Sequence, residues 1–162
     1  MGRVHEGRDV SADLAEIRRE AADLSDWLRR EGRGEEGLAF DALQESVEAI
    51  LLGAIVRGEE LPGPDSLGVD PEPYLSGLGD VVGEVRRLAL DRLGAGDLAG
   101  AEAHLATMDH LFRTLLRFET PRSIAQLKPK QDSARSLVER TRGDVIMARV
   151  LSGRRTGGEG TQ

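Results

Sequence analysis

The sequence predicts an all-α protein, an antiparallel helical bundle, and three observations support this. Every periodic run of apolar residues has spacings of three and four, which place side chains on one face of a helix. No stretch shows the alternation of apolar and polar residues that is typical of a strand. Aromatic residues make up only 3% of the chain, so leucine, alanine and valine must fill the core. With 162 residues, the simplest organisation is one domain over residues 1–151 and a disordered tail over residues 152–162.

Five helices are expected, bounded by residues that favour helix ends. In the first, an apolar stripe runs between the N-cap candidate Ser11 and the stop candidate Gly32. Asp97 is the expected N-cap of the fourth, whose apolar stripe runs from Leu98 to Leu115. The second, third and fifth helices are expected over residues 36–57, 73–93 and 129–149. The stretch GEELPGPDSLGVDPEP between the second and third helices is rich in proline and glycine, so it is predicted to be the longest loop.

Composition excludes several classes of protein and site. The chain has no cysteine, so disulfides, thiolate chemistry and zinc sites built on sulfur are excluded. No apolar run approaches the roughly 20 residues that a membrane-spanning helix needs. The first ten residues, MGRVHEGRDV, lack the apolar core of a signal peptide. The expected location is therefore the cytoplasm, without a membrane partner.

Charge is distributed unevenly along the chain. The net charge is −7, but residues 121–162 carry nine Arg or Lys against four Asp or Glu. A basic end on an acidic body is typical of a strip that binds nucleic acid. A charged helix face that simply meets water is the simpler interpretation of the charges alone, and both stay open at this point.

Four carboxylates stand out because of their apolar surroundings. Glu45 and Glu48 are three residues apart in LQESVEAILLGAIV, so they lie on one helix face. Residues 50–56 are apolar nearly all round, which indicates burial and places Glu48 at the mouth of a buried segment. Asp80 and Glu84 share a face of the third helix, beside three glycines that favour close helix packing: Gly77, Gly79 and Gly83.

A half-buried carboxylate is costly unless it is paired or bound to a cation. Two acidic pairs on facing helices would form an all-oxygen site suited to Mg²⁺ or Mn²⁺. The competing interpretation is a salt bridge to Arg86 or Arg87, without metal. Spacing alone does not decide between the two.

The ordered segments resemble the translin family, which includes translin and translin-associated factor X. LQESVEA resembles the family's acidic second-helix motif, PYLSGLGDVVGEVRRLALDRLGAGD its longest signature, and LVERTRGDV its closing Arg-Gly segment. The resemblance runs from about Glu36 to Asp144. VHEGRD resembles the segment after the family's first helix, so that helix is expected to be largely missing here.

The resemblance implies a helical protomer that assembles into closed shells, often octamers, and binds RNA or DNA on basic interior surfaces. The translin-associated factor X branch implies a Mg²⁺-dependent endoribonuclease. Carried over position by position, its catalytic acids and metal ligands fall on Glu45, Glu48 and Asp80, with Glu84 as a further ligand. Mn²⁺ is the alternative metal.

The basic residues are then expected to hold the RNA backbone without reading sequence. The candidates are Arg86, Arg87, Lys128, Lys130, Arg135, Arg140 and Arg142. The leading hypothesis is a metal-dependent endoribonuclease that acts on RNA phosphodiesters as a homo-oligomer. The alternative is a non-catalytic shell protein that binds RNA or single-stranded DNA. A third hypothesis is a helical interaction module that binds no nucleic acid.

Overall fold

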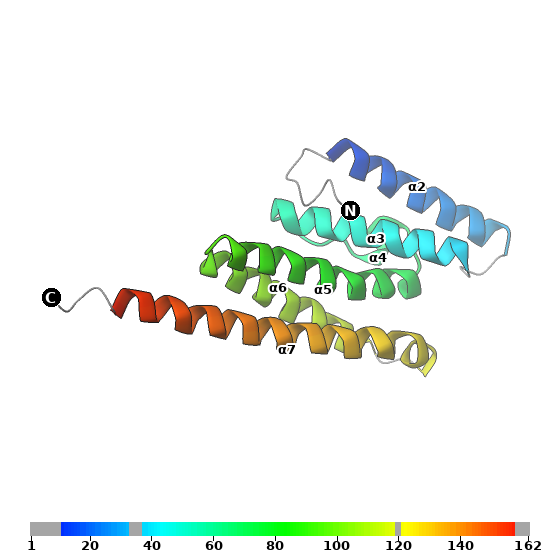
Figure 1. Cartoon of the computed structure of the whole chain (residues 1–162). Coiled ribbons are helices and arrows are strands. Elements are labelled where there is room, and N and C mark those ends of the chain that lie inside the picture. Colours follow the sequence, from blue (N-terminus) through cyan, green and yellow to red (C-terminus); the bar gives the residue numbers. More distant parts are fainter. Residues whose placement is uncertain (1–10, 33–36, 119–120, 158–162) are drawn as a thin grey trace.

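The computed structural model describes residues 11–32, 37–118 and 121–157, and within these ranges every regular element is a helix (Figure 1). This confirms the all-α prediction. The helices are α2 (Ser11–Arg30), α3 (Leu38–Arg57), α4 (Pro64–Leu67), α5 (Pro71–Gly94), α6 (Leu98–Leu116) and α7 (Pro121–Gly157). The segment VHEGRD lies outside the described residues, and so do residues 158–162 of the expected tail. None of the helices in the described ranges is long and apolar enough to cross a membrane.

Helix direction is mixed. The pairs α2/α3, α5/α6 and α6/α7 are antiparallel, as expected, but α3, α5 and α7 run in the same direction with α5 in the middle (Figure 1). The contacts agree with this order, because Gln44 of α3 meets Ser76 of α5 while Glu48, one turn later, lies near Asp80 and Glu84. Likewise, Asp80 meets Lys130 of α7 while Arg86, further along α5, meets Thr141. Residues 58–70 make the parallel order possible, since a connection of this length reaches about 40 Å and α3 is about 30 Å long.

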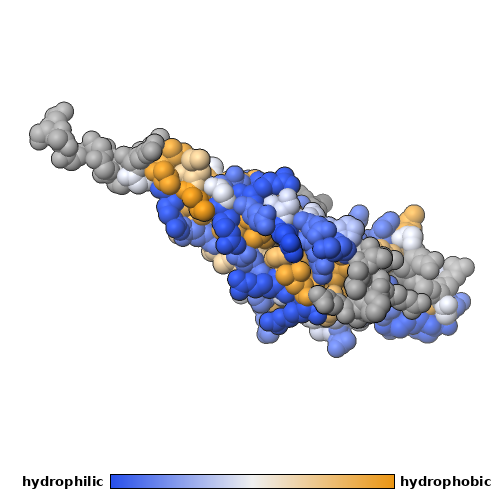
Figure 2. Space-filling view, turned by 90° about the horizontal axis from the view of Figure 1, so that it is seen from below, coloured by the Kyte–Doolittle hydropathy of each residue, from blue (hydrophilic) through white to orange (hydrophobic). Residues whose placement is uncertain are grey.

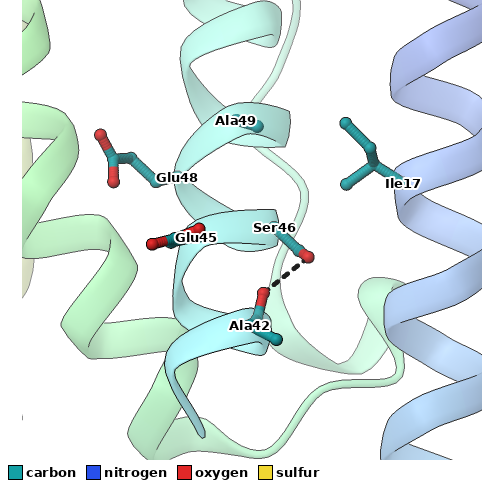
Figure 3. Close-up of a pocket in the computed structure, with 6 residues that line it drawn as sticks. All are labelled: Ile17, Ala42, Glu45, Ser46, Glu48 and Ala49. Carbon is teal, nitrogen blue, oxygen red and sulfur yellow. Dashed lines mark hydrogen bonds between the residues drawn. The ribbon is translucent and has the colours of Figure 1, made fainter. Parts of the chain in front are cut away.

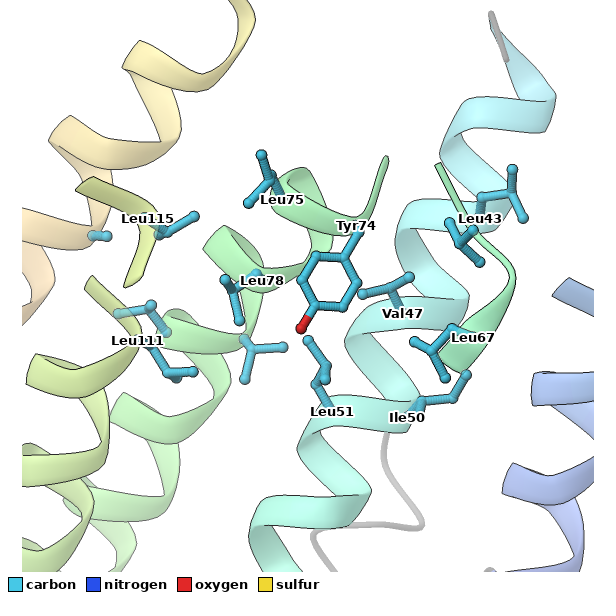
Figure 4. Close-up of a cluster of buried hydrophobic side chains, with 14 of the residues drawn as sticks. Leu43, Val47, Ile50, Leu51, Leu67, Tyr74, Leu75, Leu78, Leu111 and Leu115 are labelled. Carbon is cyan, nitrogen blue, oxygen red and sulfur yellow. The ribbon is translucent and has the colours of Figure 1, made fainter. Parts of the chain in front are cut away.

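The core lies where α3, α5 and α6 meet (Figure 4). The fully buried leucines and valines of this cluster come from several helices: Leu43, Val47 and Leu51 of α3, Leu78, Val81, Val82 and Val85 of α5, and Leu111 and Leu115 of α6. The short helix α4, which the sequence analysis missed, adds Leu67 to this cluster. The hydroxyl of the buried Tyr74 donates to the carbonyl of Pro62 at 3.0 Å and so ties the same connection to the core.

Two glycines of α5 allow neighbouring helices to approach closely. A Cβ added at Gly77 would lie 2.7 Å from the carbonyl oxygen of Gln44 in α3. A Cβ at Gly79 would lie 3.0 Å from the Cβ of Lys130 in α7. The third glycine, Gly83, has an ordinary distance of 3.8 Å to its nearest neighbour, Leu137. Close packing through glycine therefore applies to the first two, one on each side of α5.

The prediction for the last helix, residues 129–149, was wrong at both ends. α7 begins at Pro121 and contains Pro129, whose fixed φ is compatible with a helix although it loses one hydrogen bond. Buried Leu127 and Ala134 hold this segment on the core on either side of the proline. The expected tail is likewise helical as far as Gly157, because one glycine, Gly153, costs a helix only about 1 kcal/mol.

The C-terminal part of α7 extends past the ends of α5 and α6 (Figure 1). It leaves four large apolar side chains exposed: Ile146, Met147, Val150 and Leu151. They form an apolar stretch beside the C-terminal end in the view from below (Figure 2).

At the start of α6, the Asp97 side chain accepts a hydrogen bond from the Gly100 amide at 2.9 Å, which confirms the predicted cap.

Candidate functional site

The parallel arrangement of α3 and α5 brings the two predicted acidic pairs to the same level of the bundle. Glu48 is half-buried where α3 enters the core, and Glu45 is exposed one turn earlier. Both side chains point from α3 toward the side on which α5 lies (Figure 3). Asp80 and Glu84 are half-buried on α5. The sequence could not show that these helices face each other, and the structure shows that they do.

The pKa of Glu48 is raised by its burial and by the other three acids. It is raised from its ordinary value of 4.5 to about 7, first by burial and then by the negative charges of Asp80, Glu84 and Glu45. The positive charge of Lys130 acts in the opposite direction but does not cancel these effects. The four acids are thus an electrostatically coupled group, which we call the acidic cluster.

Asp80 is held by partners from both neighbouring helices. Lys130 Nζ donates to the two carboxylate oxygens at 2.6 and 2.7 Å. Gln44 Nε2 donates to Oδ2 at 2.7 Å, and the other end of the Gln44 amide accepts a hydrogen bond from the Ser76 hydroxyl. The Asp80 and Lys130 side chains are only 30% and 29% exposed, so this ion pair is partly shielded from solvent.

Sequence reasoning missed the positions of Lys130 and Gln44 in this site. Lys130 was predicted to contact RNA, and the expected salt-bridge partners were Arg86 and Arg87. The structure instead places a lysine from α7 on Asp80, across a separation of 50 residues that no local pattern reveals. Gln44 lies inside the quoted acidic motif, and only its contact with Asp80 gives it a role.

Most of the other predicted phosphate contacts are engaged within the protein. Arg86 donates to the Thr141 hydroxyl and pairs with Asp144 of α7. The remaining contacts are Arg142 with Asp109, Arg135 over the ring of Phe112, Lys128 with Asp132, and Arg140 with Ser136. A role in RNA binding stays a prediction for all of these residues.

Arg87 differs from this group. It is exposed, and it makes no ion pair or hydrogen bond with the part of the chain that the structure describes. It lies seven residues after Asp80 and three after Glu84, so all three share one stripe of α5. A guanidinium is therefore available beside the acidic cluster.

The donor chemistry of the acidic cluster is of the type that a divalent cation requires. Its four carboxylates supply only oxygen, the ligand type that Mg²⁺ and Mn²⁺ prefer. The present arrangement is different: within residues 11–32, 37–118 and 121–157, no group of three or more His, Asp or Glu side chains is placed to hold a metal ion. At Asp80, the ammonium of Lys130 supplies the positive charge.

A pocket of about 560 Å³ is lined by residues of α2 and α3, among them Glu45 and Glu48 of the cluster (Figure 3). Its lining combines apolar and acidic side chains: Ile17, Ala42, Glu45, Ser46, Glu48 and Ala49. Two of the four acids therefore border a space that a solvent-borne ligand can enter.

Comparison with known proteins supports one family. The Translin family model matches residues 8–143. A curated relative, the protein MJ0175 of Methanocaldococcus jannaschii, is 35% identical over 104 residues, which are 64% of this chain and 47% of that protein. The chain thus spans about half the length of the curated relative it matches.

Solved structures agree with this assignment. AfC3PO is 30% identical with a TM-score of 0.63, covering 93% of this chain and 95% of that chain. AfC3PO in a duplex RNA complex is 29% identical at the same TM-score, covering 93% and 94%. Apo-NeC3PO has a TM-score of 0.65 but only 20% identity, covering 91% and 98%, so it supports the fold alone. From the family match over most of its length, together with its helical fold, the chain belongs to the translin family.

Proposed function

We propose that the chain is a metal-dependent endoribonuclease that cleaves RNA phosphodiesters without reading sequence. The observation that carries this proposal is the convergence of Glu45, Glu48, Asp80 and Glu84 across α3 and α5, where the other acids add to the effect of burial in raising the pKa of Glu48 to about 7. RNA is the proposed substrate because the similar protein AfC3PO has been solved in complex with duplex RNA.

Each acid has a proposed role. Glu45, Glu48 and Asp80 would hold Mg²⁺, with Mn²⁺ as the alternative and Glu84 as a further ligand. When bound, the metal would neutralise charge on the scissile phosphate and lower the pKa of a water molecule. Of these carboxylates, Glu48 would also accept the proton of the attacking water.

Arg87 is the proposed phosphate contact nearest the acids, because it is exposed on their stripe of α5. Its planar guanidinium suits bidentate contact with phosphate oxygens. Lys128, Arg135, Arg140 and Arg142 are exposed on α7 and would contribute by exchanging their present partners for phosphate. Such contacts hold the backbone without specifying the bases.

A non-catalytic protein that binds RNA or single-stranded DNA is the second candidate, and a specific observation favours it. Lys130 already pairs with Asp80, so this carboxylate has a positive partner without any metal. Under this alternative the carboxylates are structural, and the basic side chains alone would bind nucleic acid.

The assembly and location are also proposals. We expect copies of the chain to form a homo-oligomer, an octamer in the simplest case, in the cytoplasm. The exposed apolar end of α7 would suit contacts between copies.

Cleavage of a fluorescent single-stranded RNA and of a duplex RNA in Mg²⁺, Mn²⁺ or EDTA separates the two candidates. The nuclease predicts cutting that requires metal and stops in EDTA. The binding protein predicts no cutting under any condition, with salt-sensitive RNA binding that persists in EDTA. Absence of both cutting and binding, even at low salt, would contradict both proposals.

A further inference from the structure

Lys130 reaches the acidic cluster along a path that α5 leaves open. The lysine stem lies against Gly79, where an added Cβ would come within 3.0 Å of Lys130 Cβ and 3.4 Å of Lys130 Cδ. Any larger residue at position 79 would push the stem away. The apolar part of the side chain thus packs on the helix while its ammonium extends to the next residue, Asp80.

The ammonium contacts Asp80 at the carboxylate itself, within the range at which it also acts on Glu48. Nζ contacts both carboxylate oxygens, and Oδ2 also accepts a hydrogen bond from Gln44. Lys130 also acts electrostatically on Glu48, whose pKa it lowers against the effect of burial. One side chain of α7 therefore interacts with acids of both α3 and α5.

Two cations cannot share this position. A divalent ion that binds Asp80 within the cluster would have to replace the ammonium, since positive charges so close together repel strongly in a partly shielded site. The displaced lysine side chain would stay near the cluster, because α7 is held against the core on either side of Lys130. The residues that hold it there are the buried Leu127 and Ala134.

We propose that Lys130 is an internal counter-ion of the acidic cluster, which a divalent cation must displace from Asp80 in order to bind. The inference rests on the proposed function, in which these acids hold a metal. Lys130 then neutralises Asp80 without metal and raises the metal concentration that loading requires. The apparent affinity for metal is reduced in proportion to the fraction of molecules in which the lysine is in place.

A titration of the full chain with Mn²⁺ tests this proposal without any need for activity. Binding is monitored by the loss of the free-ion signal in electron paramagnetic resonance. Lys130→Met keeps an apolar stem and removes the charge, so it should lower the Kd for Mn²⁺ by about tenfold if the pair is formed in roughly 90% of molecules. Lys128→Met is the matched control: it removes the same charge two residues away, where the side chain is exposed and paired with Asp132. Its Kd should stay within about twofold of that of the wild type.

The outcomes are distinguishable. A Kd that is unchanged or increased in Lys130→Met, with helical circular dichroism retained, would overturn the counter-ion role alone. If neither the wild type nor any variant binds Mn²⁺, the metal site of the proposed function fails as well. Lys130→Gln is the second variant in case the methionine is not tolerated, and loss of folding in both would identify a purely structural ion pair and overturn the proposal.

Discussion

The pKa of Glu48, raised to about 7, makes the stability of the fold depend on pH. The folded protein binds this proton more tightly than the unfolded chain, in which the carboxyl has its ordinary pKa of 4.5. The ionised carboxylate therefore destabilises the fold fully above pH 7, and the penalty falls as pH decreases from 7 toward 4.5. A salt-bridged acid has the opposite effect, because its pKa is lowered and its ionised form stabilises the fold.

Glu48→Gln should accordingly stabilise the fold at pH 8. After allowance for partial exposure, we expect the free energy of unfolding to rise by about 1–2 kcal/mol. At pH 5 the gain should be much smaller, since Glu48 is then largely protonated in the folded protein. Urea denaturation at pH 8 and pH 5 measures the difference.

Glu45→Gln provides the control, because Glu45 is exposed on the same helix and near the same acids. Its variant should show a smaller gain at pH 8. A Glu48→Gln variant that is less stable than the wild type at pH 8 would contradict this prediction. It would show that other groups in the folded protein stabilise the ionised carboxylate of Glu48.

The position of Glu48 was predictable, whereas its surroundings were not. The apolar run over residues 50–56 predicted burial, and residues 50–54 are buried, whereas Ile55 is half-buried and Val56 is exposed. Lys130, by contrast, is 82 residues away along the chain, and its contact depends on how α7 packs against α5. Such a contact is set by tertiary packing, which leaves no trace in residue spacing.

At the scale of the helices, α5 owes its close neighbours to glycine. Gly77→Ala should lower the free energy of unfolding by about 1–3 kcal/mol, because the new methyl group would meet the Gln44 carbonyl at 2.7 Å and force α3 away. Gly83→Ala is the matched control on the same helix, with its nearest neighbour at 3.8 Å. It should be stabilising by about 0.5–1 kcal/mol, since alanine is the better helix former. Thermal or urea unfolding of the two variants measures both effects.

Equal destabilisation by the two substitutions would contradict this account, because it would mean that α5 tolerates no added methyl group on either face. Equal stabilisation would mean that α3 moves freely to accommodate the group.

Helix ends were predictable where one residue determines them, as at Asp97, whose side chain caps α6. They were not predictable at Pro129, because a proline is compatible both with a first turn and with the interior of a helix that is held by packing. The short helix α4 was missed for a related reason. It consists of four residues, fewer than two turns, so it has no apolar period to detect.

At the scale of the whole molecule, the acidic cluster depends on the parallel order of α3, α5 and α7. That order was not anticipated, because the expectation was an antiparallel bundle and spacing does not show which helices are neighbours. The helical class follows from periodicity, and the family was identified through the segments LQESVEA and YLSGLGDVVGE. The grouping of the four acids could be inferred only through that resemblance, and the structure supplies the physical contact.

The central claim is that the acidic cluster carries out phosphodiester cleavage, and the rate of single-stranded RNA cleavage in Mg²⁺ by Glu48→Gln relative to the wild type tests it most directly. Glutamine keeps the size of the side chain and removes its charge and its capacity to accept a proton. We predict a rate lower by about a hundredfold or more, with an unchanged helical circular dichroism spectrum. Cleavage by Glu48→Gln at the wild-type rate would contradict the assignment.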